Sequence, residues 1–210
     1  MPGGKRKPAM KTKIDIISGS LGAGKTTLIK KLIREAYHGE KLVIVQNEYG
    51  AETFSAQELG TAGIDLEGVS AGCICCDGSA NFISSIESIV AWTQPERILL
   101  EPSGLGRLSD IKAMLRSACG EYTEISGTAA VADARKAELY LRNFRGVYDD
   151  QIANAACIVL SRAEALDPEL LEKRITLLKT LNPGARMIYG AWNGIPGGEI
   201  AEAMKCRAEI

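Results

Sequence analysis

Apolar residues along this chain fall into two alternating patterns. Short unbroken apolar runs are separated by longer segments in which apolar residues recur every three to four positions. Unbroken runs are typical of strands buried on both faces, whereas the longer period is typical of amphipathic helices. The pattern predicts strands at 14–17, 42–45, 64–69, 97–100, 128–132, 157–160 and 187–189.

The expected helices lie between these runs, at 28–36, 82–90, 111–118, 168–181 and 200–204. Asp133 is expected to cap the helix that follows the strand before it, and Pro168 to stand in the first turn of its helix. Strands that alternate with helices predict an α/β fold, a doubly wound, mostly parallel sheet with helices on both faces. Functional loops are then expected at the carboxyl ends of the strands.

A glycine-rich loop joins the first expected strand to the first expected helix. It has the full G-x-x-x-x-G-K-[ST] spacing of a P-loop, whose backbone N–H groups form a cradle for phosphates at a helix N-terminus. The loop predicts a P-loop NTPase fold and a nucleoside triphosphate ligand. Lys25 is expected to reach the β- and γ-phosphates, and the Thr26 hydroxyl to ligate Mg²⁺. The expected nucleotide-binding residues of this loop are Gly19, Gly22, Ala23, Gly24, Lys25, Thr26 and Thr27.

The stretch from Glu101 to Gly104 ends a later buried strand. A carboxylate at such a position can hold Mg²⁺, directly or through water, or orient the attacking water, and Gly104 can present its N–H to the γ-phosphate. Lys25 and Glu101 are therefore the expected catalytic residues, with Thr26 and Glu101 as the expected Mg²⁺ ligands.

Three cysteines, Cys73, Cys75 and Cys76, stand within four residues and beside glycine. Thiolates at this spacing favour soft or borderline ions such as Zn²⁺, Cu(I) or Co²⁺, and three protein ligands leave a fourth position open. Glu48, after the second strand, is a possible oxygen ligand for the same ion. The other cysteines, Cys119, Cys157 and Cys206, are expected to be ordinary small side chains.

Composition and charge narrow the function classes. The chain has 210 residues, 46% of them hydrophobic and 24% charged, which predicts one globular domain at 13–210 after a basic flexible tail at 1–12. A net charge of −1 gives no electrostatic reason to expect nucleic acid or a membrane surface as partner. No apolar run approaches the roughly 20 residues of a membrane span. The cysteine pattern, without an export signal, predicts the cytoplasm.

The segments 19–27, 47–50, 72–76, 101–104 and 151–155 together resemble the CobW-type GTPases, over a match from about 13 to 200. The resemblance implies a GTP-hydrolysing metallochaperone or cofactor-insertion factor that passes Zn²⁺ or Co²⁺ to a client metalloprotein or cofactor enzyme. It also implies that the cysteine loop and Glu48 hold the metal, that segment 47–63 acts as the switch, and that a nucleotide-dependent homodimer is possible.

The sequence departs from the family in several places. The guanine motif N-K-x-D appears as Ser161-Arg162-Ala163-Glu164. Glu164 can still accept from the paired donors of guanine, and the Arg162 stem can cover the purine face, so GTP is expected over ATP. Ser79 and Asn81 stand where the family usually has arginine and aspartate. We expect these 210 residues to form the GTPase domain only, without the smaller C-terminal domain and the histidine-rich tract of the family.

Two other functions stay open at this point. One is an ATPase that activates a corrinoid or other cofactor enzyme without carrying metal itself. The other is a metal-responsive nucleotide-binding module whose hydrolysis is vestigial.

Overall fold

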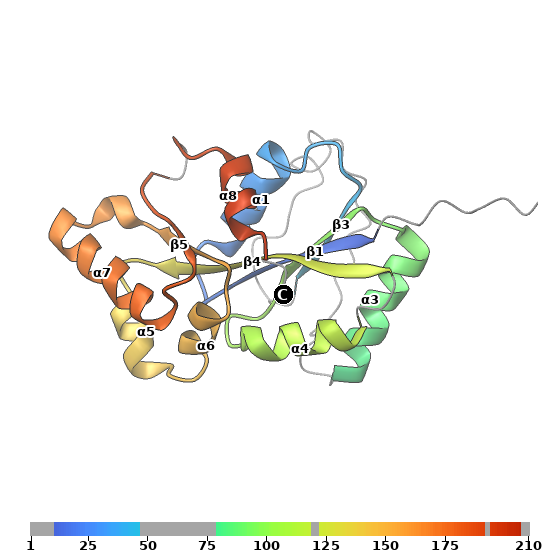
Figure 1. Ribbon diagram of the computed structural model, residues 1–210, viewed down its shortest axis with the longest axis horizontal. Coiled ribbons are helices and arrows are strands. Elements are labelled where there is room, and N and C mark those ends of the chain that lie inside the picture. Colours follow the sequence, from blue (N-terminus) through green and yellow to red (C-terminus); the bar gives the residue numbers. More distant parts are fainter. Residues whose placement is uncertain (1–10, 47–78, 119–121, 192–193, 207–210) are drawn as a thin grey trace, which may run out of the picture.

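The computed structural model describes residues 11–46, 79–118, 122–191 and 194–206. This part of the chain forms a six-stranded sheet in the order β2-β3-β1-β4-β5-β6, with every neighbouring pair parallel and helices on both faces (Figure 1). The predicted doubly wound parallel sheet is confirmed. The strands are β1 (Thr12–Gly19), β2 (Leu42–Gln46), β3 (Arg97–Glu101), β4 (Thr123–Asp133), β5 (Cys157–Ser161) and β6 (Arg186–Ile188).

The helices divide between the two faces of the sheet (Figure 1). One face is covered by α1 (Lys25–Glu35) and α8 (Gly197–Met204), which share an apolar core with β1, β4 and β5. The other face carries a larger core, to which α3 (Ser79–Thr93), α4 (Leu108–Ala118), α6 (Tyr148–Ala153) and α7 (Pro168–Leu181) contribute buried residues. Two short elements complete the chain, α5 (Ala137–Asn143) and the 3₁₀ turn η1 (Ala163–Ala165).

Local signals in the sequence explain several element boundaries. Pro168 stands in the first turn of α7, as predicted, and the Asp167 carboxylate caps that helix by accepting the Leu170 N–H at 2.9 Å. All five residues of β3 and of β5 are buried, as expected for central strands of a parallel sheet.

The prediction for Asp133 is wrong. Helix α5 begins at Ala137 with Lys136 as its N-cap residue, and Asp133 is the last residue of β4. Its Oδ1 accepts the backbone N–H of Arg135 at 3.0 Å, which closes a turn and not a helix. The last strand also ends earlier than predicted, at Ile188, so that Tyr189 lies outside it.

Several sequence predictions fall outside the described residues. They are the expected strand at 64–69, the switch segment at 47–63 and residues 1–10 of the tail; β1 itself begins at Thr12. Within the described ranges, no helix is both long enough and apolar enough to cross a bilayer.

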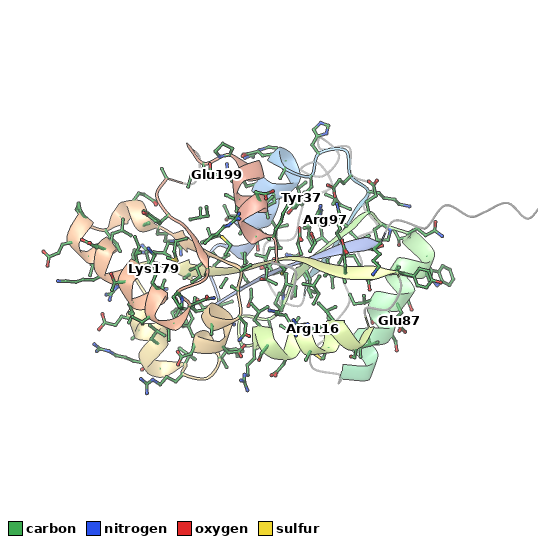
Figure 2. The ribbon with its side chains drawn as sticks, in the orientation of Figure 1. Tyr37, Glu87, Arg97, Arg116, Lys179 and Glu199 are labelled. Atoms are coloured by element: carbon green, nitrogen blue, oxygen red, sulfur yellow. The ribbon has the colours of Figure 1, made fainter. Side chains whose placement is uncertain are left out.

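A buried charge cluster fills the space between α1 and the amino-terminal ends of β1 and β3. Arg97 donates to Asp15 at 2.7 Å and to Glu40 at 2.7 Å, and the Tyr37 hydroxyl donates to Asp15 at 2.6 Å. The Arg97 guanidinium also lies 3.9 Å from the centre of the Tyr37 ring, and the two side chains are seen together in Figure 2. The cluster fixes the end of the sheet that lies opposite the glycine loop.

Candidate nucleotide site

The site is built where the carboxyl ends of neighbouring strands meet. The register pairs Gln46 of β2 with Glu101 of β3, and Asp133 of β4 with Ser161 of β5. Because β1 lies between β3 and β4, its last residue, Gly19, reaches the same edge. The topology therefore gathers polar residues that lie far apart in the sequence around the glycine loop, as expected for an open α/β sheet.

The glycine loop has a conformation that only glycine adopts easily. Gly19, Gly22 and Gly24 have φ values of 137°, 67° and 107°. A Cβ at Gly19 would lie 2.2 Å from the Val131 carbonyl oxygen, so this position also demands glycine for space. Gly24 is the N-cap residue of α1 and no side chain caps this helix, which leaves its first N–H groups for an anion.

Lys25, Thr26 and Glu101 converge directly beyond the loop. The Lys25 side chain is 3% exposed, and its Nζ donates to the Ser20 carbonyl at 3.2 Å. The Thr26 hydroxyl lies 3.2 and 3.3 Å from the two carboxylate oxygens of Glu101. Gln46 Nε2 donates to Glu101 Oε2 at 2.7 Å. A buried carboxylate beside a threonine hydroxyl is an oxygen ligand pair of the kind Mg²⁺ prefers, so these residues fit the ion.

The loop after β3 packs on the glycine loop. A Cβ at Gly104 would lie 2.8 Å from the backbone nitrogen of Leu21, so the two loops touch through their backbones. Gln151 of α6 holds this arrangement, since its Nε2 donates to the carbonyls of Gly104 at 3.1 Å and Gly106 at 2.9 Å. Gly104 therefore lies against the glycine loop, and its contact with phosphate stays a prediction. Gln151 was not predicted as a site residue.

The residues expected to read the base lie on the other side of the glycine loop. Ser161 is buried and its hydroxyl donates to the Ala132 carbonyl at 3.4 Å. Arg162, with φ 56°, donates from both terminal nitrogens to the Gly22 carbonyl at 3.0 Å. Glu164 is exposed on η1. Arg162 is therefore brought to the glycine loop, Ser161 stays bonded to the neighbouring strand, and Glu164 is exposed.

Asp133 is a residue of this site that the sequence reading missed. Its Oδ2 accepts from Arg162 at 2.6 Å and from Arg135 at 3.2 Å. Burial by itself would raise the pKa of Asp133, but the hydrogen bonds from Arg135 and the charge of Arg162 lower that pKa below its ordinary value. Asp133 thus stays ionised and holds Arg162 against the loop. A carboxylate directly after an apolar run was the available signal.

The predicted transition-metal ligands, Cys73, Cys75, Cys76 and Glu48, lie outside the described residues. Elsewhere, in the part of the chain that is described, no group of three or more His, Cys, Asp or Glu side chains is arranged to hold a metal. Cys157 is fully buried in β5, as predicted, and its burial raises the pKa of the thiol to about 12. Such a thiol is inert.

Similarity to known proteins covers most of the chain. It is 28% identical to the zinc chaperone YeiR of Escherichia coli, covering 91% of this chain and 58% of that protein. It is 27% identical to the zinc-regulated GTPase metalloprotein activator 1 of Schizosaccharomyces pombe, covering 87% and 47%. The chain thus spans about half the length of these relatives.

Solved structures with the same fold include Zn(II)-bound YjiA GTPase from E. coli. Its TM-score is 0.59 at 21% identity, covering 90% of this chain and 62% of that one. The hydrogenase maturation factor HypB from Archaeoglobus fulgidus has a TM-score of 0.51 at 16% identity, covering 91% and 86%. Residues 13–189, which include the glycine loop and the side chains that converge on it, match the family described as CobW/HypB/UreG, nucleotide-binding domain. The chain therefore belongs to the CobW/HypB/UreG family.

Proposed function

We propose that this chain binds and hydrolyses GTP as the nucleotide-binding part of a zinc metallochaperone. The observation that carries the proposal is the convergence of Lys25, Thr26 and Glu101 on the glycine loop. Family membership supports it, as do relatives that are named zinc chaperones. The client protein, a nucleotide-dependent homodimer and a cytoplasmic location stay predictions from the sequence.

Each side chain has a specific role in the proposed hydrolysis. Lys25 neutralises charge that develops on the phosphates, and the N–H groups of the first turn of α1, which no side chain caps, bind phosphate oxygens. Thr26 and Glu101 would hold Mg²⁺, which supplies further neutralisation of phosphate charge. Glu101, or a residue of a partner subunit, orients the attacking water. Gly104 is proposed to offer its N–H to the terminal phosphate, and its packing on the glycine loop supports this role.

The proposed cargo is Zn²⁺ bound by Cys73, Cys75 and Cys76, with Glu48 as an oxygen ligand; Co²⁺ is the second choice. Three thiolates with one open position suit a metal that is to be handed on. We further propose that GTP and the metal affect each other's affinity by the same factor, since linkage between two sites is reciprocal.

A zinc titration tests this coupling. Zinc affinity is measured with and without a non-hydrolysable GTP analogue, and the coupled sites require tighter binding of zinc when the analogue is present. Cys75→Ser is expected to abolish tight zinc binding while leaving analogue affinity unchanged. Zinc affinities that do not respond to the analogue would remove the chaperone function but not the nucleotide site.

The alternative that this chain is an ATPase depends on the residues expected to contact the base. The Arg162 guanidinium is bonded to Gly22 and Asp133, and Glu164 replaces the shorter aspartate of the guanine motif. Competition of ATP and GTP for one fluorescent nucleotide separates the two cases, and we expect GTP to win. Preference for ATP would support the cofactor-enzyme activator instead.

Vestigial hydrolysis has a separate test. An unassisted Ras-type GTPase turns over at about 3–5 × 10⁻⁴ s⁻¹. We expect turnover at or above roughly this rate once Mg²⁺ and zinc are supplied. A rate below about 10⁻⁴ s⁻¹ under those conditions would favour a metal-responsive binding module.

A further inference from the structure

A cavity of about 750 Å³ lies at the end of the sheet opposite the glycine loop. Part of its wall comes from the amino-terminal half of β4, from Ala156 directly before β5, and from Arg186, the first residue of β6. The rest comes from α4 and from the ends of α6, α7 and α8. The nucleotide site is built at the carboxyl ends of the strands, and the cavity shares none of its residues.

The wall of this cavity is strongly cationic. Among the described residues, its charged members are four cations and one carboxylate: Lys112, Arg116, Arg186, Lys205 and Glu124. Lys205 is already paired with Glu202. Lys112 and Arg186 bond only neutral carbonyls in the described part of the chain. Cations that face one cavity repel one another, so an anion bound between them is stabilised.

Part of this positive charge belongs to the fold. Lys112 Nζ donates to the Asn154 carbonyl at 3.2 Å, at the end of α6, and Arg186 Nη1 donates to the Glu202 carbonyl at 2.9 Å, in the last turn of α8. Cations stabilise the carboxyl ends of helices in this way. Each of these bonds uses one N–H, whereas an ammonium has three and a guanidinium has five. The other N–H groups can bind an anion while both helix ends stay capped.

The rest of the wall favours a small ligand. Among the described residues, no aromatic side chain lines the cavity, and none of the large apolar side chains exposed elsewhere reaches it. Protein partners are usually anchored by such side chains, and the bases of nucleic acids stack on them. Small-molecule sites have volumes of roughly 300–1,000 Å³, and this cavity lies within that range.

We propose that this cavity binds a small molecule with at least two negative charges, carried by phosphate groups or by carboxylates. The Arg186 guanidinium, a planar fork of donors, and the Lys112 ammonium, a compact charge, bind the anionic oxygens. Arg116 adds positive charge to the same wall. At least two charges are required because the cations stand on different elements, α4 and β6. Binding here does not rest on the proposed nucleotide site.

The first test titrates the full chain with pyrophosphate and with citrate by isothermal calorimetry, while sodium chloride keeps the ionic strength constant. At least one of the two should bind and raise the melting temperature, because a ligand of the folded state stabilises that state. The tighter of the two identifies phosphate or carboxylate as the chemistry of the ligand. Binding of neither polyanion would overturn the proposal.

Two controls separate this cavity from other kinds of site. Pyrophosphate can also enter the phosphate cradle, so the titrations are repeated on Lys25→Ala, which should still bind one polyanion per chain. Binding that this substitution abolishes would assign the anion to the glycine loop and refute the cavity. The peptide acetyl-Glu-Glu-Glu-Glu-amide should bind more weakly than the better polyanion. A peptide that binds more tightly would assign the cavity to an acidic protein segment instead of a small molecule.

Substitutions in the wall locate the bound anion. Lys112→Gln and Arg186→Gln should each weaken the better polyanion about tenfold, the value of one charge-assisted hydrogen bond, whereas Lys112→Arg should bind almost normally. Glu124→Gln should tighten binding severalfold, because it removes a negative charge from the wall; a damaged fold would not produce this gain. Lys179→Gln, an exposed lysine of α7 outside the wall, is the matched control and should bind normally. Affinities that are equal in all these variants would place the anion elsewhere and overturn the proposal.

Discussion

The two ends of β1 and β3 hold buried charge in different ways. At the amino end, Arg97 and Asp15 form an ion pair at 2.7 Å, and the Tyr37 hydroxyl also donates to Asp15. At the carboxyl end, the Glu101 carboxylate is just as buried, and its partners include the neutral donors of Thr26 and Gln46. Among the described residues, the buried hydroxyls of Ser18 and Ser20, near the end of β1, have no hydrogen-bond partner.

This difference suggests different roles for the two ends of the same strands: one end supports the fold, and the other carries the proposed site. In the amino-terminal cluster the negative and positive charges are matched, and removing Arg97 leaves the Asp15 carboxylate buried without its cation. At the carboxyl end, we propose that the donors from Thr26 and Gln46 give way to a metal ion bound by Glu101. The amino-terminal cluster thus organises the sheet, whereas the carboxyl end carries the proposed nucleotide and metal site.

The largest expected effect is at the amino end. Arg97→Met leaves the Asp15 carboxylate buried with the Tyr37 hydroxyl as its donor, so we expect the free energy of unfolding to fall by about 3–5 kcal/mol. Urea denaturation measures this loss. The double variant Asp15→Leu, Arg97→Met should recover most of the stability, and any chain that stays folded should bind nucleotide normally. A loss below about 1 kcal/mol would show that Arg97 is not the main partner of the buried Asp15 charge.

The next effect is at the carboxyl end. Lys25→Ala is expected to lower GTP turnover by about 10²–10³-fold, because it removes the charge that faces the phosphates. We expect the free energy of unfolding to change far less than the turnover does, which urea denaturation measures. Lys179→Ala, an exposed lysine of α7 labelled in Figure 2, is the control and should change neither quantity. Parallel loss of stability and turnover would contradict the contrast between the two ends.

A smaller effect concerns the donor that orients Glu101. Gln46→Leu removes the hydrogen bond of 2.7 Å to Glu101 Oε2 while keeping an apolar stem of similar size. Outer-shell partners of this kind are worth about 10–100-fold in metal affinity, so the Mg²⁺ concentration for half-maximal turnover should rise by that factor. Magnesium titration of the GTPase rate measures it. An unchanged Mg²⁺ requirement would argue against Glu101 as a metal ligand.

The smallest effect is an ion pair at the protein surface. Hydrogen bonds from Arg34 and Lys31 lower the pKa of Glu35 from its usual 4.5 to about 2, and the carboxylate also accepts the Gly197 N–H. Because the folded pKa is depressed, this stabilisation is present above pH 4.5 and is lost as the pH falls towards 2.

Solvent screens this pair, so we expect it to contribute only about 0.5–1 kcal/mol. Glu35→Gln should lower the free energy of unfolding by that amount at pH 7 and by less at pH 3. Unfolding curves at both values test the sign. A variant that is equally destabilised at both pH values would show that the ionised carboxylate is not the source.

Local patterns were enough to predict most of the sheet and the glycine loop. The apolar runs of β3 and β5 are strands in almost any context, and the loop spacing is specific to phosphate binding. Partners distant in sequence were not predictable, because Asp15 and Arg97 are 82 residues apart and only the parallel register brings them together.

The errors have equally local causes. Aspartate after an apolar run precedes both helices and tight turns, so Asp133 was interpreted as a cap when it closes a turn and orients Arg162. Helices α5 and α6 have seven and six residues, too few for a periodic pattern. Helix α6 nevertheless supplies Gln151. The strand pattern alone could not predict that this residue lies beside Gly104.

Gln151 also couples α6 to the loop after β3. Its amide donates to two carbonyls of the loop after β3, and Asn182 donates to the carbonyls of Ile152, the next residue of α6, and Ala155, just beyond the helix. A displacement of that loop therefore either breaks both Gln151 bonds or carries α6 with it. In the second case, Asn182 transmits the displacement of α6 to the last turn of α7. That turn lies towards the edge of the sheet opposite β2.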